Sequence, residues 1–282
     1  MVVQTQPHRF ADRRQPGTGN RRPWRLAVTV ALAAVVVATA AACAPPGAPP
    51  PPPPPTGGSQ TFPTLPPGSA LPSDQDCRSR VRAAAENRAT NATANHTVGH
   101  ATAAEADNPF TARVTGNMTG TTDEIIQWIA CKWGIAEDVV RAQVAKESWW
   151  HQDTLGDFTT DASACAPKHP IGVDGRPGQC PESVGLMQDR TQYMRPWIDD
   201  ALASSAYNMD IAYAIWRNCF EGNETWLNTV ERGRQYGAGD AWGCIGRWFS
   251  GRWYTQPAND YIAGVQDYLN RRIWTTSDFA NG

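Results

Sequence analysis

Seven consecutive prolines, Pro49–Pro55, set the first limit on how this chain can fold. A run of prolines has no backbone N–H groups to donate and forms an extended polyproline II helix, so it cannot contribute to a packed core. The surrounding residues 43–72 are also rich in Pro, Gly and Thr. We therefore expect residues 43–72 to be a flexible linker, with any compact domain on its C-terminal side.

The residues before the linker have the layout of an export signal. A basic stretch precedes an apolar run and then three alanines, Ala40–Ala42, which is typical of a secretory signal peptide over residues 1–42. Cys43 follows directly, and this arrangement resembles a bacterial lipoprotein cleavage site, in which the Cys becomes the lipidated N-terminus. Ala40 stands where such sites prefer Leu, so plain secretion or an uncleaved anchor are the alternatives. We expect a membrane-anchored lipoprotein on the cell surface.

The charge of the chain argues against one class of partner. Residues 1–42 hold six Arg and one Asp, so their removal changes the formal net charge from −2 to −7. Because phosphate neutralisation needs Lys and Arg, such an acidic chain is a poor nucleic-acid binder. We expect a monomer with no nucleic-acid partner.

Six cysteines follow Cys43, and an even number beyond a signal peptide predicts three disulfides. They are Cys77, Cys131, Cys165, Cys180, Cys219 and Cys244. We favour the pairs Cys165–Cys180 and Cys219–Cys244, because each closes a short loop, which leaves Cys77–Cys131. Zinc binding is the alternative, but no C-x-x-C occurs and the five His form no ligand-like cluster. We therefore expect no metal and no cofactor.

The rest of the chain divides into a polar segment and a helical domain. Residues 73–114 are rich in Ala, Asn and Thr and should be marginally ordered, whereas residues 115–282 should form the compact domain. Thr121 and Glu124 form a capping box that opens a helix, which Gly134 ends. Later helical patterns cover Arg190–Leu202, Asn208–Phe220, Trp226–Arg232 and Pro257–Trp274. Since no alternating strand pattern appears after residue 110, we expect a mainly α fold.

Glu147 lies at the end of a second predicted helix, which begins near Ala136. Val140, Val144 and Glu147 are spaced i, i+4 and i+7, so the carboxyl group lies on the apolar stripe. Burial and the negative end of the helix dipole both raise the pKa of such a group. A carboxyl group that keeps its proton near neutral pH can act as a general acid. The alternative is a solvated Glu at a fraying helix end. The long loop that follows, Trp149–Val184, is typical of a functional loop.

Two motifs in order resemble those of a known family. Glu147-Ser148, followed by Gly185-Leu186-Met187-Gln188, resembles the E-S … G-L-M-Q signature of soluble lytic transglycosylase domains, relatives of goose-type lysozyme. The resemblance covers about residues 115–275. Asn208 resembles the Asn of the family's N-I-x-x-G helix start. The third motif, A-Y-N-A-G, corresponds to Arg247–Gly251, where Trp248 replaces the Tyr. The resemblance implies a lysozyme-like helical domain with a long active-site loop.

The resemblance also implies a reaction, cleavage of the β-1,4 bond between N-acetylmuramic acid and N-acetylglucosamine in peptidoglycan. Glu147 would protonate the leaving oxygen and then accept a proton as the muramyl C6 hydroxyl closes a 1,6-anhydro ring. The chain would thus be a glycan-cleaving lyase acting on peptidoglycan strands. One alternative is a muramidase that uses water, for which a second carboxylate would help. The candidates for it are Asp153, Asp157, Asp161 and Asp174, and formation of turns is the alternative role for each. The other alternative is a non-catalytic wall-binding lipoprotein.

Several further side chains are candidates for binding the glycan. By the resemblance, the G-L-M-Q motif lines the cleft floor, and Gly185 permits close approach of a sugar. Ser148 would either position Glu147 or satisfy the helix end. Trp248 in place of the third-motif Tyr leaves open which group contacts the acid, and Tyr254 is a candidate. Eleven of the 12 Trp follow residue 120, and flat aromatic rings suit the faces of sugars, although core packing is the alternative. The candidate substrate-binding residues are Ser148, Trp150, Gly185, Leu186, Met187, Gln188, Asn208, Trp248, Trp253 and Tyr254.

Overall fold

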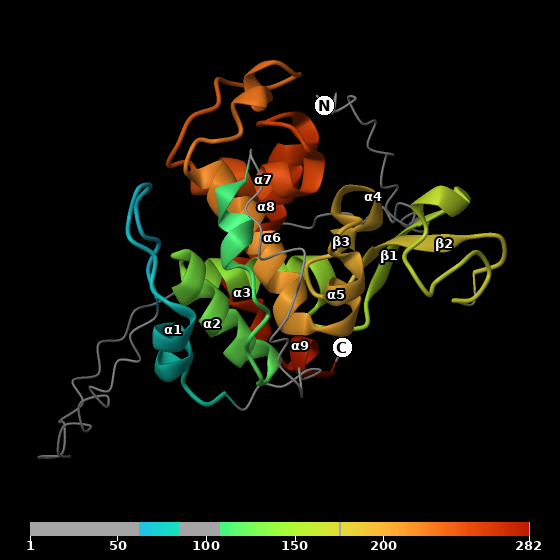
Figure 1. Cartoon of the computed structure of the whole chain (residues 1–282), viewed down its shortest axis with the longest axis horizontal. Coiled ribbons are helices and arrows are strands. Elements are labelled where there is room, and N and C mark those ends of the chain that lie inside the picture. Colours follow the sequence, from blue (N-terminus) through green and yellow to red (C-terminus); the bar gives the residue numbers. More distant parts are fainter. Residues whose placement is uncertain (1–61, 85–107, 175, 282) are drawn as a thin grey trace, which may run out of the picture. The chain divides into compact units, whose positions relative to one another are not determined.

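The computed structural model describes residues 62–84, 108–174 and 176–281 (Figure 1). The predicted signal peptide, Cys43 and the proline run lie outside these residues. The fold is mainly α, as predicted. The helices are α1 (Asp74–Arg80), α2 (Thr122–Trp133), α3 (Glu137–Ser148), α4 (Thr191–Met194), α5 (Ile198–Ala203), α6 (Ser205–Phe220), α7 (Ala241–Ser250), α8 (Gln256–Arg271) and α9 (Ser277–Asn281). The strands are β1 (Leu155–Thr159), β2 (Cys180–Val184) and β3 (Asp189–Arg190).

Local signals in the sequence set the bounds of α2 and α3. The Thr121 hydroxyl accepts a hydrogen bond from the Glu124 amide, and the Glu124 carboxylate accepts one from the Thr121 amide at 2.8 Å. This is the predicted capping box. Gly134 ends α2 with a left-handed φ of 59°. Helix α3 follows after two residues and is ended by Trp149, which is also left-handed. Glu147 therefore lies in the last turn of α3, as predicted.

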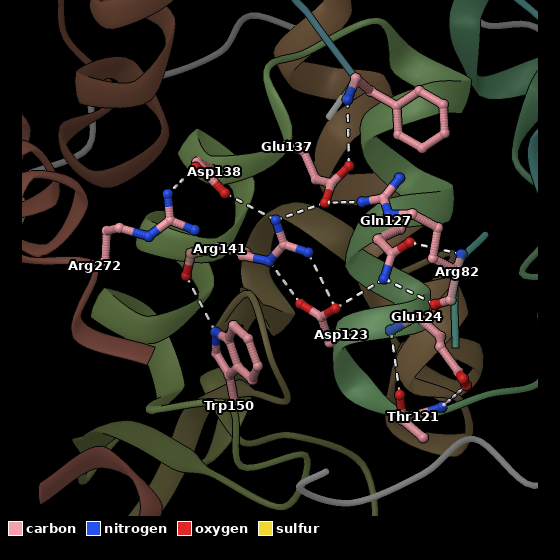
Figure 2. Close-up of polar contacts among 11 residues, drawn as sticks. Arg82, Thr121, Asp123, Glu124, Gln127, Glu137, Asp138, Arg141, Trp150 and Arg272 are labelled. Carbon is pink, nitrogen blue, oxygen red and sulfur yellow. Dashed lines mark hydrogen bonds and ion pairs between the residues drawn. The ribbon is translucent and has the colours of Figure 1, made fainter. Parts of the chain in front are cut away.

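A buried ionic network fixes α3 against α2 (Figure 2). Arg141 of α3 donates to Asp123 of α2 at 2.6 and 3.1 Å and contacts Glu137 at 2.6 Å. The fully buried Glu137 also accepts from Arg82 and from the Phe62 amide. Because a buried charge is costly unless it is paired and hydrogen-bonded, this network holds residues 62 and 82 against the two helices.

Further contacts join the segment 62–84 to the helices. The disulfide Cys77–Cys131 links α1 to α2. The buried Arg217 of α6 donates to the carbonyls of Leu65 at 3.1 Å and Pro66 at 2.9 Å. The end of the expected linker and the described part of the segment expected to be marginally ordered therefore pack against α2 and α6.

Helix α6 is joined to α2 by a buried carboxylate. Asp210 of α6 accepts from Lys132 at 2.7 Å and from the indole of Trp133 at 2.8 Å, both on α2. The Thr115 amide donates to it at 2.8 Å. Since each of these groups is satisfied by a partner, the cluster fixes the register of the two helices.

The three disulfides join the predicted pairs: Cys77–Cys131, Cys165–Cys180 and Cys219–Cys244. Such bonds are typical of proteins that fold in an oxidising compartment. Within residues 62–84, 108–174 and 176–281, no helix is long and apolar enough to span a membrane.

Three short strands follow residue 110 among the described residues, although no alternating pattern in the sequence indicates them. The loop after α3 contains an antiparallel hairpin of β1 and β2, and β3 pairs with the far edge of β2. In the register, Leu155 lies opposite Val184, and Val184 lies opposite Asp189. Neither long strand alternates between buried and exposed residues, because β1 is half-buried throughout and β2 is buried throughout. The period-2 pattern that identifies a strand is therefore missing.

The C-terminal half differs from the expectation in three places. The helix predicted over Arg190–Leu202 is two short helices, α4 and α5. The helix predicted over Trp226–Arg232 is only a 3₁₀ turn, Thr225–Asn228. Helix α7 was not predicted at all. It packs against α8, and α8 packs against α3, the helix that carries Glu147 (Figure 1).

Candidate active site

Glu147 is half-buried, and a side chain of α8 contacts it while side chains of α6 and α7 contact its neighbours. Tyr261 of α8 donates its hydroxyl to Oε1 of Glu147. One turn earlier in α3, Gln143 accepts a hydrogen bond from Tyr213 of α6 at 2.9 Å. Phe249 of α7 stacks on Tyr261 with ring centroids 4.8 Å apart and planes 2° from parallel. Tyr261 of α8 therefore orients the carboxyl group, one turn from the bond that joins α3 to α6.

The two tyrosines remain hydroxyl donors over a wide range of pH. Burial, followed by the negative charge of Glu147, raises the pKa of Tyr261 and of Tyr213 well above the ordinary value. The hydrogen bond to Glu147 raises the pKa of Tyr261 further. A neutral phenol thus contacts Glu147 whenever the carboxyl group is charged.

The G-L-M-Q turn is held by Asn208 of α6. The Asn208 side chain accepts from the Met187 amide at 2.8 Å and donates to the Val184 carbonyl at 3.1 Å. Gly185 has a φ of +77°, and a Cβ there would lie 2.5 Å from Nδ2 of Asn208. Gly185 therefore makes room for Asn208, where the resemblance implied room for a sugar. Asn208 is buried, so it supports the turn and does not face a ligand.

The side chains of the turn point inward. Leu186 and Met187 are buried in the core, so Met187 offers no face to a sugar ring. Gln188 donates to the carbonyls of Thr154 at 3.0 Å and Gly185 at 2.9 Å. The expected sugar contacts of Met187 and Gln188 are therefore wrong in this structure. The motif stabilises the turn itself.

Thr154 links this turn to the end of α3 through hydrogen bonds. Its carbonyl accepts from the Gly185 amide at 2.9 Å, and its hydroxyl donates to the Ser148 carbonyl at 3.3 Å. Ser148 itself donates to the Val144 carbonyl at 3.2 Å, so it satisfies the helix end, one of the two roles open to it. The two motifs, distant in sequence, are thus joined through one threonine.

Among the aromatic candidates, only some can reach a ligand. Trp150 and Trp253 are 0% exposed, so they belong to the core and the expectation that they line a groove is wrong. Trp248 is half-buried, and its indole donates to the Met187 carbonyl at 3.2 Å beside the turn. Tyr254 donates to Asp240 at 2.9 Å, and Tyr261 makes the contact with Glu147 that was expected of Tyr254.

Sequence reasoning missed Tyr261 and Phe249 as members of the site and did not single out Asp189. Tyr261 lies within the helical pattern Pro257–Trp274, and a buried phenol usually needs a hydrogen-bond partner. Asp189 follows the G-L-M-Q motif directly and is fully buried. In the described part of the chain, no group of three or more His, Cys, Asp or Glu could hold a metal ion.

Comparison of the chain with protein families, with curated proteins and with solved structures finds no match. The fold and the site define a mainly α, disulfide-bonded protein with one half-buried carboxyl group oriented by a buried tyrosine.

Proposed function

We propose that this protein is a peptidoglycan lytic transglycosylase with a lysozyme-like helical domain and Glu147 as its acid and base. The observation that carries the proposal is the hydrogen bond from the buried Tyr261 to the half-buried Glu147. The G-L-M-Q turn is linked to the end of the same helix through hydrogen bonds of Thr154. An oriented carboxyl group at the surface of a rigid helical framework is what a general acid needs.

In this mechanism, Glu147 donates its proton to the glycosidic oxygen as the bond from that oxygen to the muramyl C1 breaks. The C6 hydroxyl of the same sugar then forms a bond to C1 and gives its proton to the Glu147 carboxylate. The leaving sugar has gained a proton, the ring has lost one, and Glu147 returns to its starting state. Because the nucleophile belongs to the substrate, one carboxyl group can serve both steps.

The positions of the four loop aspartates support ring closure over attack by water. Asp157 accepts from Ser183 at 2.6 Å, and Asp161 accepts from the Ser163 hydroxyl at 2.7 Å. Asp174 lies 2.9 Å from His169, and Asp153 is exposed. Asp157, Asp161 and Asp174 therefore stabilise local turns and strands, which is the alternative role that the sequence gives them.

Digestion of purified cell wall tests the role of Glu147. We expect wild-type protein to release soluble muropeptides and Glu147→Gln to release them about 10²–10⁴-fold more slowly, the usual contribution of a general acid. Glu231→Gln is the matched control, because Glu231 is exposed and lies outside the site. Equal release by wild type and Glu147→Gln would remove Glu147 from the mechanism and favour a wall-binding role.

We also propose that Cys43 carries a lipid anchor that holds the protein at the outer face of the membrane. Cys43→Ser should then move the protein from the membrane fraction to the medium. Retention of the variant in the membrane fraction would instead favour an uncleaved anchor formed by the apolar run before Ala40.

A further inference from the structure

A second carboxyl group, that of Asp189, is buried and interacts electrostatically with Glu147. Asp189 is the first residue of β3, follows Gln188 directly and is 0% exposed. In the part of the chain that the structure describes, neither oxygen of its carboxyl group has a hydrogen-bond partner. An ionised carboxylate without a partner is among the costliest groups to bury, whereas the protonated acid is far less costly.

The backbone holds Asp189 close to the end of α3. Val184 and Asp189 are paired across β2 and β3. The next residue, Gly185, donates to the Thr154 carbonyl, and the Thr154 hydroxyl donates to the Ser148 carbonyl. Only a short path of hydrogen bonds therefore separates the strand pair from the turn of α3 that carries Glu147.

Burial, and after it the charge of Glu147, raise the pKa of Asp189 well above its ordinary value. Tyr207 of α6 also interacts with Asp189. Burial raises the pKa of this phenol, and the charges of Asp200, Asp210 and Asp189 add to the effect. Burial and the charge of Glu147 therefore favour the neutral form of Asp189, and the charge of an ionised Asp189 would in turn favour the neutral form of Tyr207.

Other titratable groups lie on the elements packed against β3. Arg190, the cation next to Asp189 in the chain, directs its guanidinium to Glu182 of β2. Tyr193 on α4 is exposed, and burial of part of its ring raises its pKa. Helix α5 carries two acids, Asp199 and Asp200. Arg190 therefore forms its ion pair with Glu182, and the side chains of α4 and α5 are neutral or acidic.

We propose that Asp189 is a positioning residue for Glu147, a buried carboxylic acid that keeps its proton while Glu147 donates and accepts one. The two groups titrate as a coupled pair that carries no more than one negative charge at neutral pH. Asp189 acts through Glu147, because its own side chain is buried away from any substrate.

The proton on Asp189 matters in the first step of the reaction. When Glu147 gives its proton to the glycosidic oxygen, it becomes a carboxylate. An ionised Asp189 would place a second negative charge near it in a medium of low dielectric and would oppose that step. This consequence rests on the proposed function, whereas the coupling of the two carboxyl groups does not.

The coupling can be measured by NMR on the whole protein labelled with ¹³C at the aspartate carboxyl carbon. Asp189→Asn and Asp189→Ser each remove one signal, so the assignment does not depend on a single variant. We expect this signal to be that of a protonated acid at pH 7, and its midpoint to fall by on the order of one pH unit in Glu147→Gln. The exposed Asp161, whose pKa its bonds to Ser163 lower, gives an ionised reference signal. An ionised Asp189 at pH 7, or a midpoint that Glu147→Gln leaves unchanged, would overturn the proposal.

The pH dependence of wall digestion tests the consequence for the reaction. Asp189→Asn keeps the shape of the side chain and is always neutral, so we expect near wild-type rates at pH 6–7. At alkaline pH, the wild type should lose activity through an ionisation that the variant lacks. Identical profiles would limit Asp189 to a structural role. If Glu147→Gln is inactive but leaves the titration midpoint of Asp189 unchanged, this inference alone is contradicted. If Glu147→Gln is active, the proposed function alone is contradicted.

Discussion

The hydrogen bond between Tyr261 and Glu147 makes a sharp prediction for Tyr261→Phe. The substitution removes the hydroxyl that donates to Glu147 and leaves the ring stacked on Phe249. Tyr261 is 4% exposed, so water cannot readily replace the lost donor. A hydrogen bond to a charged group contributes about 1.5–3 kcal/mol. At about 1.36 kcal/mol for each tenfold change in rate, kcat should fall roughly 10- to 150-fold.

The assay is the initial rate of muropeptide release at saturating cell wall. Tyr213→Phe is the matched control, because Tyr213 is equally buried and its hydroxyl bonds Gln143. Each variant loses a buried hydrogen bond, so the unfolding free energy in urea should fall by about 1.5–3 kcal/mol for Tyr261→Phe, whose partner is charged, and by about 1 kcal/mol for Tyr213→Phe, whose partner is neutral. Only Tyr261→Phe should lose activity on the expected scale. Equal kcat values for the two variants would refute the idea that Tyr261 orients the acid.

Three further perturbations have expected outcomes. Replacing Cys77 and Cys131 by Ala opens a loop of 54 residues, and the loop-entropy relation gives a loss of about 4 kcal/mol in unfolding free energy, measured by urea denaturation. Gly185→Ala forces a Cβ to within 2.5 Å of Asn208 at a positive φ, so it should cost about 1–3 kcal/mol, and an unchanged midpoint would contradict the packing described. For Asp189, the folded-state pKa is raised, so the folded protein binds the proton more tightly and stability falls as pH rises above the unfolded value of about 3.9. Asp189→Asn should therefore gain stability over the wild type by about 1.4 kcal/mol per pH unit above that value and up to the folded pKa, with no such gain at pH 3.

Local signals allowed the first two long helices to be predicted. The capping box at Thr121 and the left-handed Gly134 act within a few residues, so the sequence alone locates the bounds of α2 and the start of α3. The disulfide pairs followed from the even number of cysteines and from short loop lengths. These features depend little on the rest of the fold.

Features that depend on distant partners were missed. Helix α7 contains Gly243 and Gly246, which obscure a helical pattern. In the structure, a Cβ on Gly243 would lie 2.2 Å from the Trp253 ring, and one on Gly246 would lie 2.8 Å from Ile262. Both glycines serve packing against residues later in the chain. The hairpin of β1 and β2 was missed for a similar reason, because the Cys165–Cys180 bond and burial on both faces replace an alternating pattern.

The sequence indicates the two motifs of the candidate site but not the contacts of their side chains. The E-S and G-L-M-Q motifs do meet, yet the direction of each side chain depends on Asn208 and Thr154, whose contacts no spacing reveals. Tyr261 reaches Glu147 only because α8 packs on α3. Such a contact between helices that are far apart in the sequence produces no local sequence pattern.

The mass of the muropeptides released by wild-type protein tests the central claim most directly. Ring closure through the C6 hydroxyl gives 1,6-anhydromuramyl ends, which have one water less than the ends formed by hydrolysis. We predict anhydro products that disappear in Glu147→Gln. Hydrolytic ends alone, or no soluble product from either protein, would contradict the account.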